Sequence, residues 1–233
     1  PMRNMFLSAL FGGLLLCTLA AKAGVTIGGT RFIYQQGAHS LSVPLRNDSN
    51  TAWLVVTRVQ SAARWPGARV VNVEPFVVTP PMVALSAGQE ATLRLIRTQA
   101  PLPGDRETLF TLSVATIPSG KTGANHVQMG VRSALKLLYR PAGLPGDPQQ
   151  AYQKLRWTIA ASGVSVANPT PWYITLFNLQ INGKPLDNPG VVAPFASRQL
   201  SVAAGAITQI RWQTLNDYGR VMPPLTFRPG RAR

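Results

Sequence analysis

Ala91-Thr92-Leu93-Arg94-Leu95-Ile96-Arg97 alternates apolar or small side chains with polar ones over most of its length, as a half-buried β-strand does. The same period of two, or a run of β-branched and aromatic residues, recurs on both sides of it, over residues 41–47, 52–59, 108–117 and 127–139. Gly, Pro, Asn and Ser gather between these runs, at residues 47–50, 86–88, 103–105 and 119–123. Short strands separated by turns at this spacing predict an all-β sandwich or barrel.

A segment rich in proline and glycine at residues 141–150 breaks the pattern and predicts a short hinge, with one possible helical turn at residues 148–155. Strand-like runs then resume at residues 155–160, 164–167, 172–181, 199–202, 207–214 and 222–227. The blocks on the two sides, of about 120 and about 85 residues, each have a size that suits an immunoglobulin-like sandwich. We therefore expect two such domains, at residues 24–142 and 143–233.

The first 23 residues have the features of a secretory signal. Arg3 is followed by an apolar run from Met5 to Ala20, and Ala21-Lys22-Ala23 provides a small-x-small cleavage site. The run has about 16 residues, fewer than the roughly 20 that a membrane span needs. We expect cleavage after Ala23, which also removes Cys17. The mature protein then has no disulfide and no cysteine-based catalysis or zinc binding.

The chain is strongly basic, with 23 Lys and Arg against 8 Asp and Glu. Removing Arg3 and Lys22 changes the net charge from +15 to +13. Such a charge favours acidic partners, yet the basic residues are scattered and form no nucleic-acid-binding motif. We expect no nucleic-acid partner for an exported protein of this kind.

Motifs for enzymatic chemistry are missing from the sequence. It contains no G-x-S-x-G, no phosphate-binding glycine loop and no H-E-x-x-H. Asp105 and Glu107 could form a glycosidase-like acid pair, but Arg106 between them favours a structural ion pair. The sequence therefore predicts neither an enzyme nor a bound metal, cofactor or small-molecule substrate.

Six segments, in order along the chain, resemble motifs of the PapD-like periplasmic pilus-assembly chaperones, and the short connection from Pro118 to Val127 resembles the short-loop type of that family. The six segments are Gly29-Thr30-Arg31-Phe32-Ile33-Tyr34, Val78-Thr79-Pro80-Pro81-Met82, Leu102-Pro103-Gly104-Asp105-Arg106-Glu107-Thr108-Leu109-Phe110, Leu135-Lys136-Leu137-Leu138-Tyr139-Arg140-Pro141, Asn168-Pro169-Thr170-Pro171-Trp172-Tyr173 and Asn216-Asp217-Tyr218-Gly219. The resemblance runs from about Gly24 to Phe227. It implies two immunoglobulin-like domains set at an angle, residence in the periplasm, and pilus (fimbrial) subunits as partners.

Chaperones of this family lend a strand to subunits that lack one, and they deliver the subunits to an outer-membrane usher. The resemblance places the lending strand at Val127, Met129 and Val131, which share one strand face. Full burial of three such side chains is worth roughly 5–9 kcal/mol before ordering costs. The alternative is that they face the protein's own core, as residues of a last sandwich strand commonly do.

The resemblance also implies that Arg31 and Lys136 bind the C-terminal carboxylate of the subunit. Charge-assisted hydrogen bonds to that group contribute on the order of 1.5–3 kcal/mol each. Lys136 has the opposite parity to Val127, Met129 and Val131. Either a bulge intervenes, or the strand uses one face for the subunit and the other for the carboxylate.

Glu107, Arg140 and Asp217 resemble a charge network between the two domains in this family. The alternative is three separate surface charges. A second hypothesis for the whole protein is a secreted adhesin or carbohydrate-binding module, which would need a surface platform built from some of its five tryptophans, Trp53, Trp65, Trp157, Trp172 and Trp212.

Overall fold

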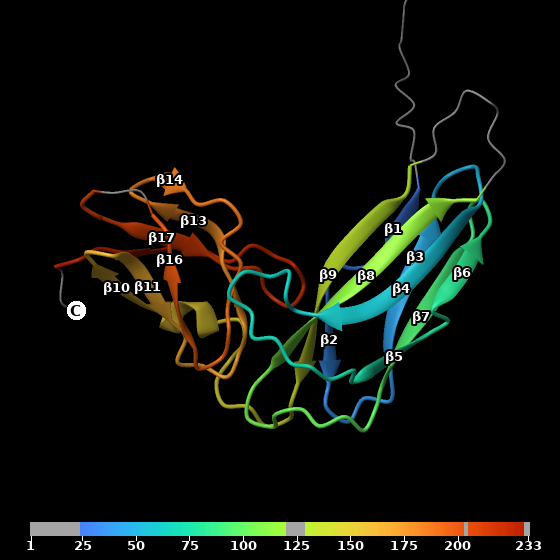
Figure 1. The fold of residues 1–233 in the computed structure, drawn as a ribbon, viewed down its shortest axis with the longest axis horizontal. Coiled ribbons are helices and arrows are strands. Elements are labelled where there is room, and N and C mark those ends of the chain that lie inside the picture. Colours follow the sequence, from blue (N-terminus) through green and yellow to red (C-terminus); the bar gives the residue numbers. More distant parts are fainter. Residues whose placement is uncertain (1–23, 120–128, 203–204, 231–233) are drawn as a thin grey trace, which may run out of the picture.

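The computed structural model describes residues 24–119, 129–202 and 205–230. The predicted signal segment at residues 1–23 and the predicted donor residue Val127 lie outside this part of the chain. Figure 1 shows two bodies rich in strands, set at an angle to each other, as expected for the fold class.

The N-terminal domain is a sandwich of two sheets. The first has the spatial order β1 (Val25–Ile27), β3 (Leu41–Asn47), β7 (Glu90–Arg97) and β5 (Phe76–Thr79). The second has the order β2 (Arg31–Gln35), β9 (Val131–Arg140), β8 (Thr108–Pro118), β4 (Trp53–Ser61) and β6 (Met82–Leu85).

Alternating residues of the two sheets build the core of this domain. Leu93 and Leu95 of β7 are buried against Phe110 and Leu112 of β8 and Leu137 of β9, within one apolar cluster. Thr92 and Arg94, on either side of Leu93, are exposed on the outer face, so the period of two in the sequence is the period of burial here.

The described part of the C-terminal domain has nine strands in three groups. A three-stranded sheet has the order β10 (Arg156–Ala160), β11 (Gly163–Ala167) and β16 (Ser197–Leu200). A four-stranded sheet has the order β14 (Lys184–Pro185), β13 (Phe177–Ile181), β17 (Ile210–Gln213) and β18 (Leu225–Phe227). The strands β12 (Ile174–Thr175) and β15 (Val191–Val192) form a separate pair, and a 3₁₀ turn, η1 (Ala151–Lys154), follows the hinge.

The single strand expected at residues 172–181 is wrong. Trp172 lies in a loop with its indole buried, and its Nε1 donates to the carbonyl of Pro145 at 3.1 Å. The chain then forms β12 and, after Leu176, enters a different sheet as β13. Asn178 has a positive φ of 48°, and the register with β17 shifts at this point, so an apolar run here belongs to two strands.

The chain changes sheets between β1 and β2. β1 pairs with β3 in the first sheet, whereas β2 pairs with β9 in the second sheet and runs parallel to it. Gly28 makes this crossing possible because a Cβ there would lie 2.5 Å from the Pro44 ring. β2 reaches β9 only at the Arg31–Lys136 pair and follows it to the Gln35–Arg140 pair.

Candidate functional site

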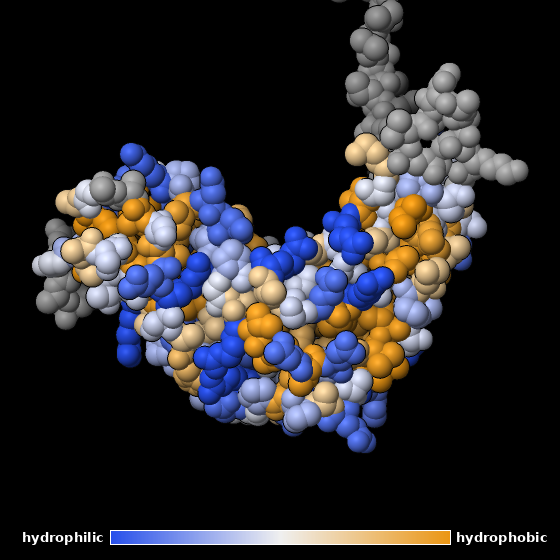
Figure 2. Space-filling view, in the orientation of Figure 1, coloured by the Kyte–Doolittle hydropathy of each residue, from blue (hydrophilic) through white to orange (hydrophobic). Residues whose placement is uncertain are grey.

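A cleft between the two domains collects the predicted carboxylate-binding residues. Figure 2 shows the surface hollowed between the domains, with hydrophilic residues along the hollow. Arg31 and Lys136 are direct neighbours on β2 and β9, and both line this cleft. Thr175 and Leu215 of the C-terminal domain line it from the other side.

The Arg31 guanidinium lies across the cleft but is not fully bonded. Its Nη1 donates to the carbonyl of Leu215 at 3.0 Å, and its Nη2 contacts Thr175 Oγ1 at 3.5 Å. Its Nε is buried and has no hydrogen-bond partner. Burial lowers the pKa of Arg31, although the nearby charges of Asp217 and Glu107 act in the opposite direction.

Lys136 is a second half-buried cation directly beside the first. Burial, together with the smaller effect of the neighbouring Arg31 charge, lowers its pKa to about 8. Its Nζ lies 4.2 Å from the ring centroid of Trp65. Within the described residues, neither Arg31 nor Lys136 forms an ion pair. Two neighbouring cations with spare hydrogen-bonding capacity can bind an anionic group that enters the cleft.

β9 presents two different faces, and the regular pairing explains the parity of Lys136. The register between β8 and β9 is uninterrupted from Val131 to Tyr139, so no bulge intervenes. Val131 therefore shares a face with the core residues Leu137 and Tyr139, and Lys136 lies on the opposite face.

The face that carries Val131 continues beyond the core. Leu137 is fully buried, but Val131 is 56% exposed, and Met129 ahead of it is 75% exposed. The side chain of Val131 is thus on the core-facing side of β9, at a level that the sandwich no longer covers, and Met129, which precedes the strand, is exposed beside it. The alternative, that these residues are buried in the protein's own core, is wrong for both Val131 and Met129.

The edge of β9 is open over the same length. β8 pairs with β9 along residues 131–139, but on the other side β2 pairs only with residues 136–140. In the described part of the chain, residues 131–135 have no strand on that side. Unpaired backbone groups of this kind are available for another strand.

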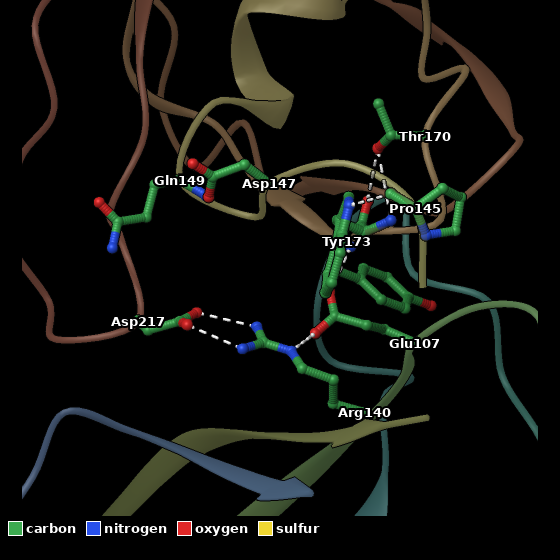
Figure 3. Close-up of polar contacts among 9 residues, drawn as sticks. Glu107, Arg140, Pro145, Asp147, Gln149, Thr170, Tyr173 and Asp217 are labelled. Atoms are coloured by element: carbon green, nitrogen blue, oxygen red, sulfur yellow. Dashed lines mark hydrogen bonds and ion pairs between the residues drawn. The ribbon is translucent and has the colours of Figure 1, made fainter. Parts of the chain in front are cut away.

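Glu107, Arg140 and Asp217 form one connected group across the domain boundary (Figure 3). Arg140 Nε donates to Glu107 at 2.9 Å, and its Nη1 and Nη2 donate to the two oxygens of Asp217 at 2.8 and 2.9 Å. Glu107 also accepts from the backbone N–H of Tyr173 at 2.8 Å. Residues before β8, at the end of β9 and in the C-terminal domain are therefore bonded together.

This group is largely buried. Burial raises the pKa of Glu107 to about 7, against the opposing influence of Arg140 and of the Tyr173 N–H. Burial alone lowers the pKa of Arg140, but the hydrogen bonds and charges of Asp217 and Glu107 outweigh it and hold that pKa above its ordinary value. Arg140 is the shared partner of both carboxylates.

Asp105 and Glu107 do not form an acid pair. Asp105 is exposed and bonded to Arg106 at 2.9 Å, whereas Glu107 is buried against Arg140. Over the part of the chain that the structure describes, no cluster of three His, Cys, Asp or Glu residues could hold a metal ion, and no helix is long and apolar enough to cross a membrane.

The tryptophans do not form a surface platform for a glycan. Trp53, Trp157, Trp172 and Trp212 are buried. Trp65 is half-buried and lies over Lys136, a place that sequence reasoning did not assign to it. The available signal was the Trp-Pro-Gly sequence at residues 65–67, which marks a turn in the long connection between β4 and β5.

Two family models match nearly all of the described chain. Residues 24–145 match the N-terminal domain of PapD, a pili and flagellar-assembly chaperone, and residues 150–225 match the C-terminal domain of the pili assembly chaperone PapD.

Individual proteins agree with these matches. The chain is 46% identical over 208 residues to the uncharacterized fimbrial chaperone YcbF of Escherichia coli K12, covering 88% of each. It is 36% identical to the chaperone protein FimC of the same strain, covering 88% of this chain and 85% of FimC. A solved structure of the Salmonella enterica SafA pilin in complex with the SafB chaperone matches with a TM-score of 0.77 and 30% identity, covering 88% of this chain and 96% of that chain.

The interdomain group predicts a large effect of removing Arg140. Arg140→Met leaves Glu107 buried without its cation, and we expect the free energy of unfolding in urea to fall by about 3 kcal/mol. Adding Glu107→Gln removes the orphaned charge and should restore part of the loss. Arg46→Met, which removes a well-exposed arginine from its ion pairs, is the control and should change little. A double variant no more stable than Arg140→Met would contradict this account.

The buried charge of Lys136 predicts a pH-dependent instability of the free protein. At pH 7.5 the folded state carries most of the cost of that charge. Between about pH 8 and the ordinary lysine pKa, the unfolded chain binds more protons, so the free energy of unfolding rises with pH. We expect Lys136→Met to be more stable by on the order of 1–3 kcal/mol at pH 7.5, and the advantage to shrink at pH 10. The exposed Lys154→Met is the control; an advantage independent of pH would refute the assignment.

Proposed function

The chain belongs to the PapD family of pilus-assembly chaperones, and we propose that it captures pilus subunits in the periplasm by lending them the open edge of β9. The subunits of such a system lack a strand of their own sandwich and expose an apolar groove. The chaperone supplies that strand until another subunit replaces it, and delivers the subunit to an outer-membrane usher.

The observation that carries the proposal is where the open edge of β9 ends. A guest strand can pair with residues 131–135, but from Lys136 onward β2 occupies the edge. At that boundary lie the two cations, Arg31 and Lys136. A guest strand that ends there places its terminal carboxylate on both cations, and it must then run in the same direction as β9.

The exposed side chains of β9 complete the arrangement. Val131 and Met129 continue the apolar face of the strand outside the core of the protein. A guest sandwich without its last strand can cover them as its own core residues. Fixing the guest terminus at Arg31 and Lys136 sets the register, because a slip by one residue would turn every guest side chain to the other face. The SafB chaperone, which this chain resembles, is in complex with a pilin in its structure.

The proposed role needs no bond cleavage, no cofactor and no metal. Interdomain rigidity is part of it, because the cleft is formed by residues of both domains. The proposed task of Glu107, Arg140 and Asp217 is to hold the two domains at the angle at which the cleft admits one chain terminus.

Removing either cation should abolish stable capture. We expect Arg31→Ala and Lys136→Ala to stay folded and to retain pilus subunits about ten- to a hundredfold less well, since each loses a charge-assisted bond. The measurement is co-purification of identified pilus subunits from periplasm, with Arg156→Ala, an exposed arginine of the C-terminal domain, as control. Full capture by both variants would remove the carboxylate mechanism.

The donor face should be equally sensitive to a buried charge. Met129→Asp places a carboxylate in the groove of the subunit, and we expect capture to fall while the chaperone remains folded, because this side chain is exposed in the free protein. Met82→Asp is the matched control, since Met82 is 57% exposed on β6, at the other edge of the same sheet. Equal effects of the two substitutions would show that β9 is not the donated strand.

A further inference from the structure

The connection between β4 and β5, residues 62–75, reaches across to the C-terminal domain. The carbonyl of Pro66 accepts hydrogen bonds from the backbone N–H of Val191 at 2.8 Å and from Arg198 Nη1 at 3.1 Å. We call residues 62–69 the arm. This contact is separate from the Glu107, Arg140 and Asp217 group and involves no carboxylate.

Arg198 is bonded only to backbone carbonyls at this place. Besides Pro66, its Nη1 donates to the carbonyls of Pro189 at 2.6 Å and Val191 at 2.8 Å. The Arg198 side chain of β16 thus links the arm of the N-terminal domain to β15 and to the loop that precedes β15. A guanidinium that is held by three carbonyls fixes the position of the peptide at Pro66.

Two glycines allow this backbone-to-backbone contact. Gly67 has a φ of +83°, and a Cβ there would lie 2.1 Å from the carbonyl oxygen of Val191. Gly190 has a φ of +75°, and its Cβ would lie 2.1 Å from the carbonyl oxygen of Pro66. Any side chain at either position would force the arm away from the C-terminal domain.

Trp65, in the middle of the arm, packs against residues that line the candidate cleft. Trp65 packs with Leu109, Leu138 and Val191 in a cluster that contains residues of both domains. Its Nε1 is buried and makes no hydrogen bond, so the indole is positioned by packing and by the backbone on both sides of it. The backbone N–H of Trp65 donates to Ala62, and its carbonyl accepts from Ala68, which closes two successive turns.

We propose that the contact of Pro66 with Arg198 is a positioning device, which holds the Trp65 indole over Lys136 and so aims the ammonium at the carboxylate of the bound subunit. The proposal rests on the proposed function. It assigns Arg198, which lies in the C-terminal domain and bonds to Pro66 of the arm, a role in the cleft.

The charges around Lys136 leave the indole as its main fixed contact. Arg31 on β2 lies beside it and repels it. Glu107 and Asp217 line the same cleft, but both are bonded to Arg140. Arg64 lies over the same indole ring, 5.5 Å from its centroid. Because Lys136 has no ion pair among the described residues, its contact with the face of the Trp65 ring is what holds the side chain in one orientation. The face of an aromatic ring attracts a cation.

The test uses the free full-length chain labelled with [ε-¹³C]lysine, so it needs no subunit. Lys136 is assigned by the signal that Lys136→Arg removes. Its ε-CH₂ should show an upfield ring-current shift and a lowered pKa in the unaltered protein. Trp65→Leu should abolish the shift and raise the pKa toward the ordinary lysine value, since water then reaches the ammonium.

The decisive variants are in the C-terminal domain. Arg198→Met should reduce the ring-current shift at least twofold, whereas Arg198→Lys, which keeps donors at this place, should retain most of it. Gly190→Ala displaces Pro66 by another route and should resemble Arg198→Met. Arg156→Met is the control, and the indole proton spectrum checks that each variant is folded. An unchanged Lys136 shift and pKa in both Arg198→Met and Gly190→Ala would overturn the proposal.

Co-purification of pilus subunits then distinguishes a failure of the proposed function from a failure of the proposed role of the arm. If the proposed function is wrong, the unaltered protein captures no subunit. If only the role of the arm is wrong, the unaltered protein and Arg198→Met capture subunits equally well.

Discussion

The crossing of the chain from one sheet to the other at Gly28 determines which part of the β9 edge stays open. Because β1 belongs to one sheet and β2 to the other, β2 covers only the second half of β9. One crossing therefore produces an open edge at residues 131–135 and a covered edge from Lys136 onward. It also places Arg31, the first residue of β2, beside Lys136 at the boundary between the two. A β2 that paired with the whole of β9 would leave no edge to lend.

Several features near this boundary are unfavourable for the free protein. An open strand edge promotes association, exposed Val131 and Met129 leave apolar surface in water, and two half-buried cations lie side by side. Each of these has a counterpart in a guest: a strand, an apolar groove and a carboxylate. The Arg140 group and the Pro66–Arg198 contact hold the surrounding frame together, so these costs are confined to one cleft and one edge.

Much of the fold was predictable from the sequence, because burial in a sandwich follows the period of two. Residues 91–95 alternate in burial as they alternate in character, and the break at residues 141–150 falls between the two sandwiches. The prediction failed at residues 172–181, where a positive φ at Asn178 and the change of sheet at Leu176 have no periodic signal. Sequence separation also hides contacts made across domains, which is why Trp65 and Arg198 were not associated with the cleft, whereas Arg31 and Lys136 could be paired through family motifs.

Under the proposed function, the direction of β2 makes the cleft selective for a chain end. β2 runs parallel to β9, so its first residue lies level with Lys136, and the body of β2 follows beyond that point. A guest strand beside residues 131–135 meets this obstruction head-on and cannot continue along the edge. An internal segment of a polypeptide would have to turn away there and would leave both cations without an anion. A strand that terminates at the obstruction brings a carboxylate to the place where two charges are already desolvated, and the cost of burying those charges was incurred when the chaperone folded. The proposed specificity for a terminus thus rests on a steric stop and an unpaired charge at the same residue pair.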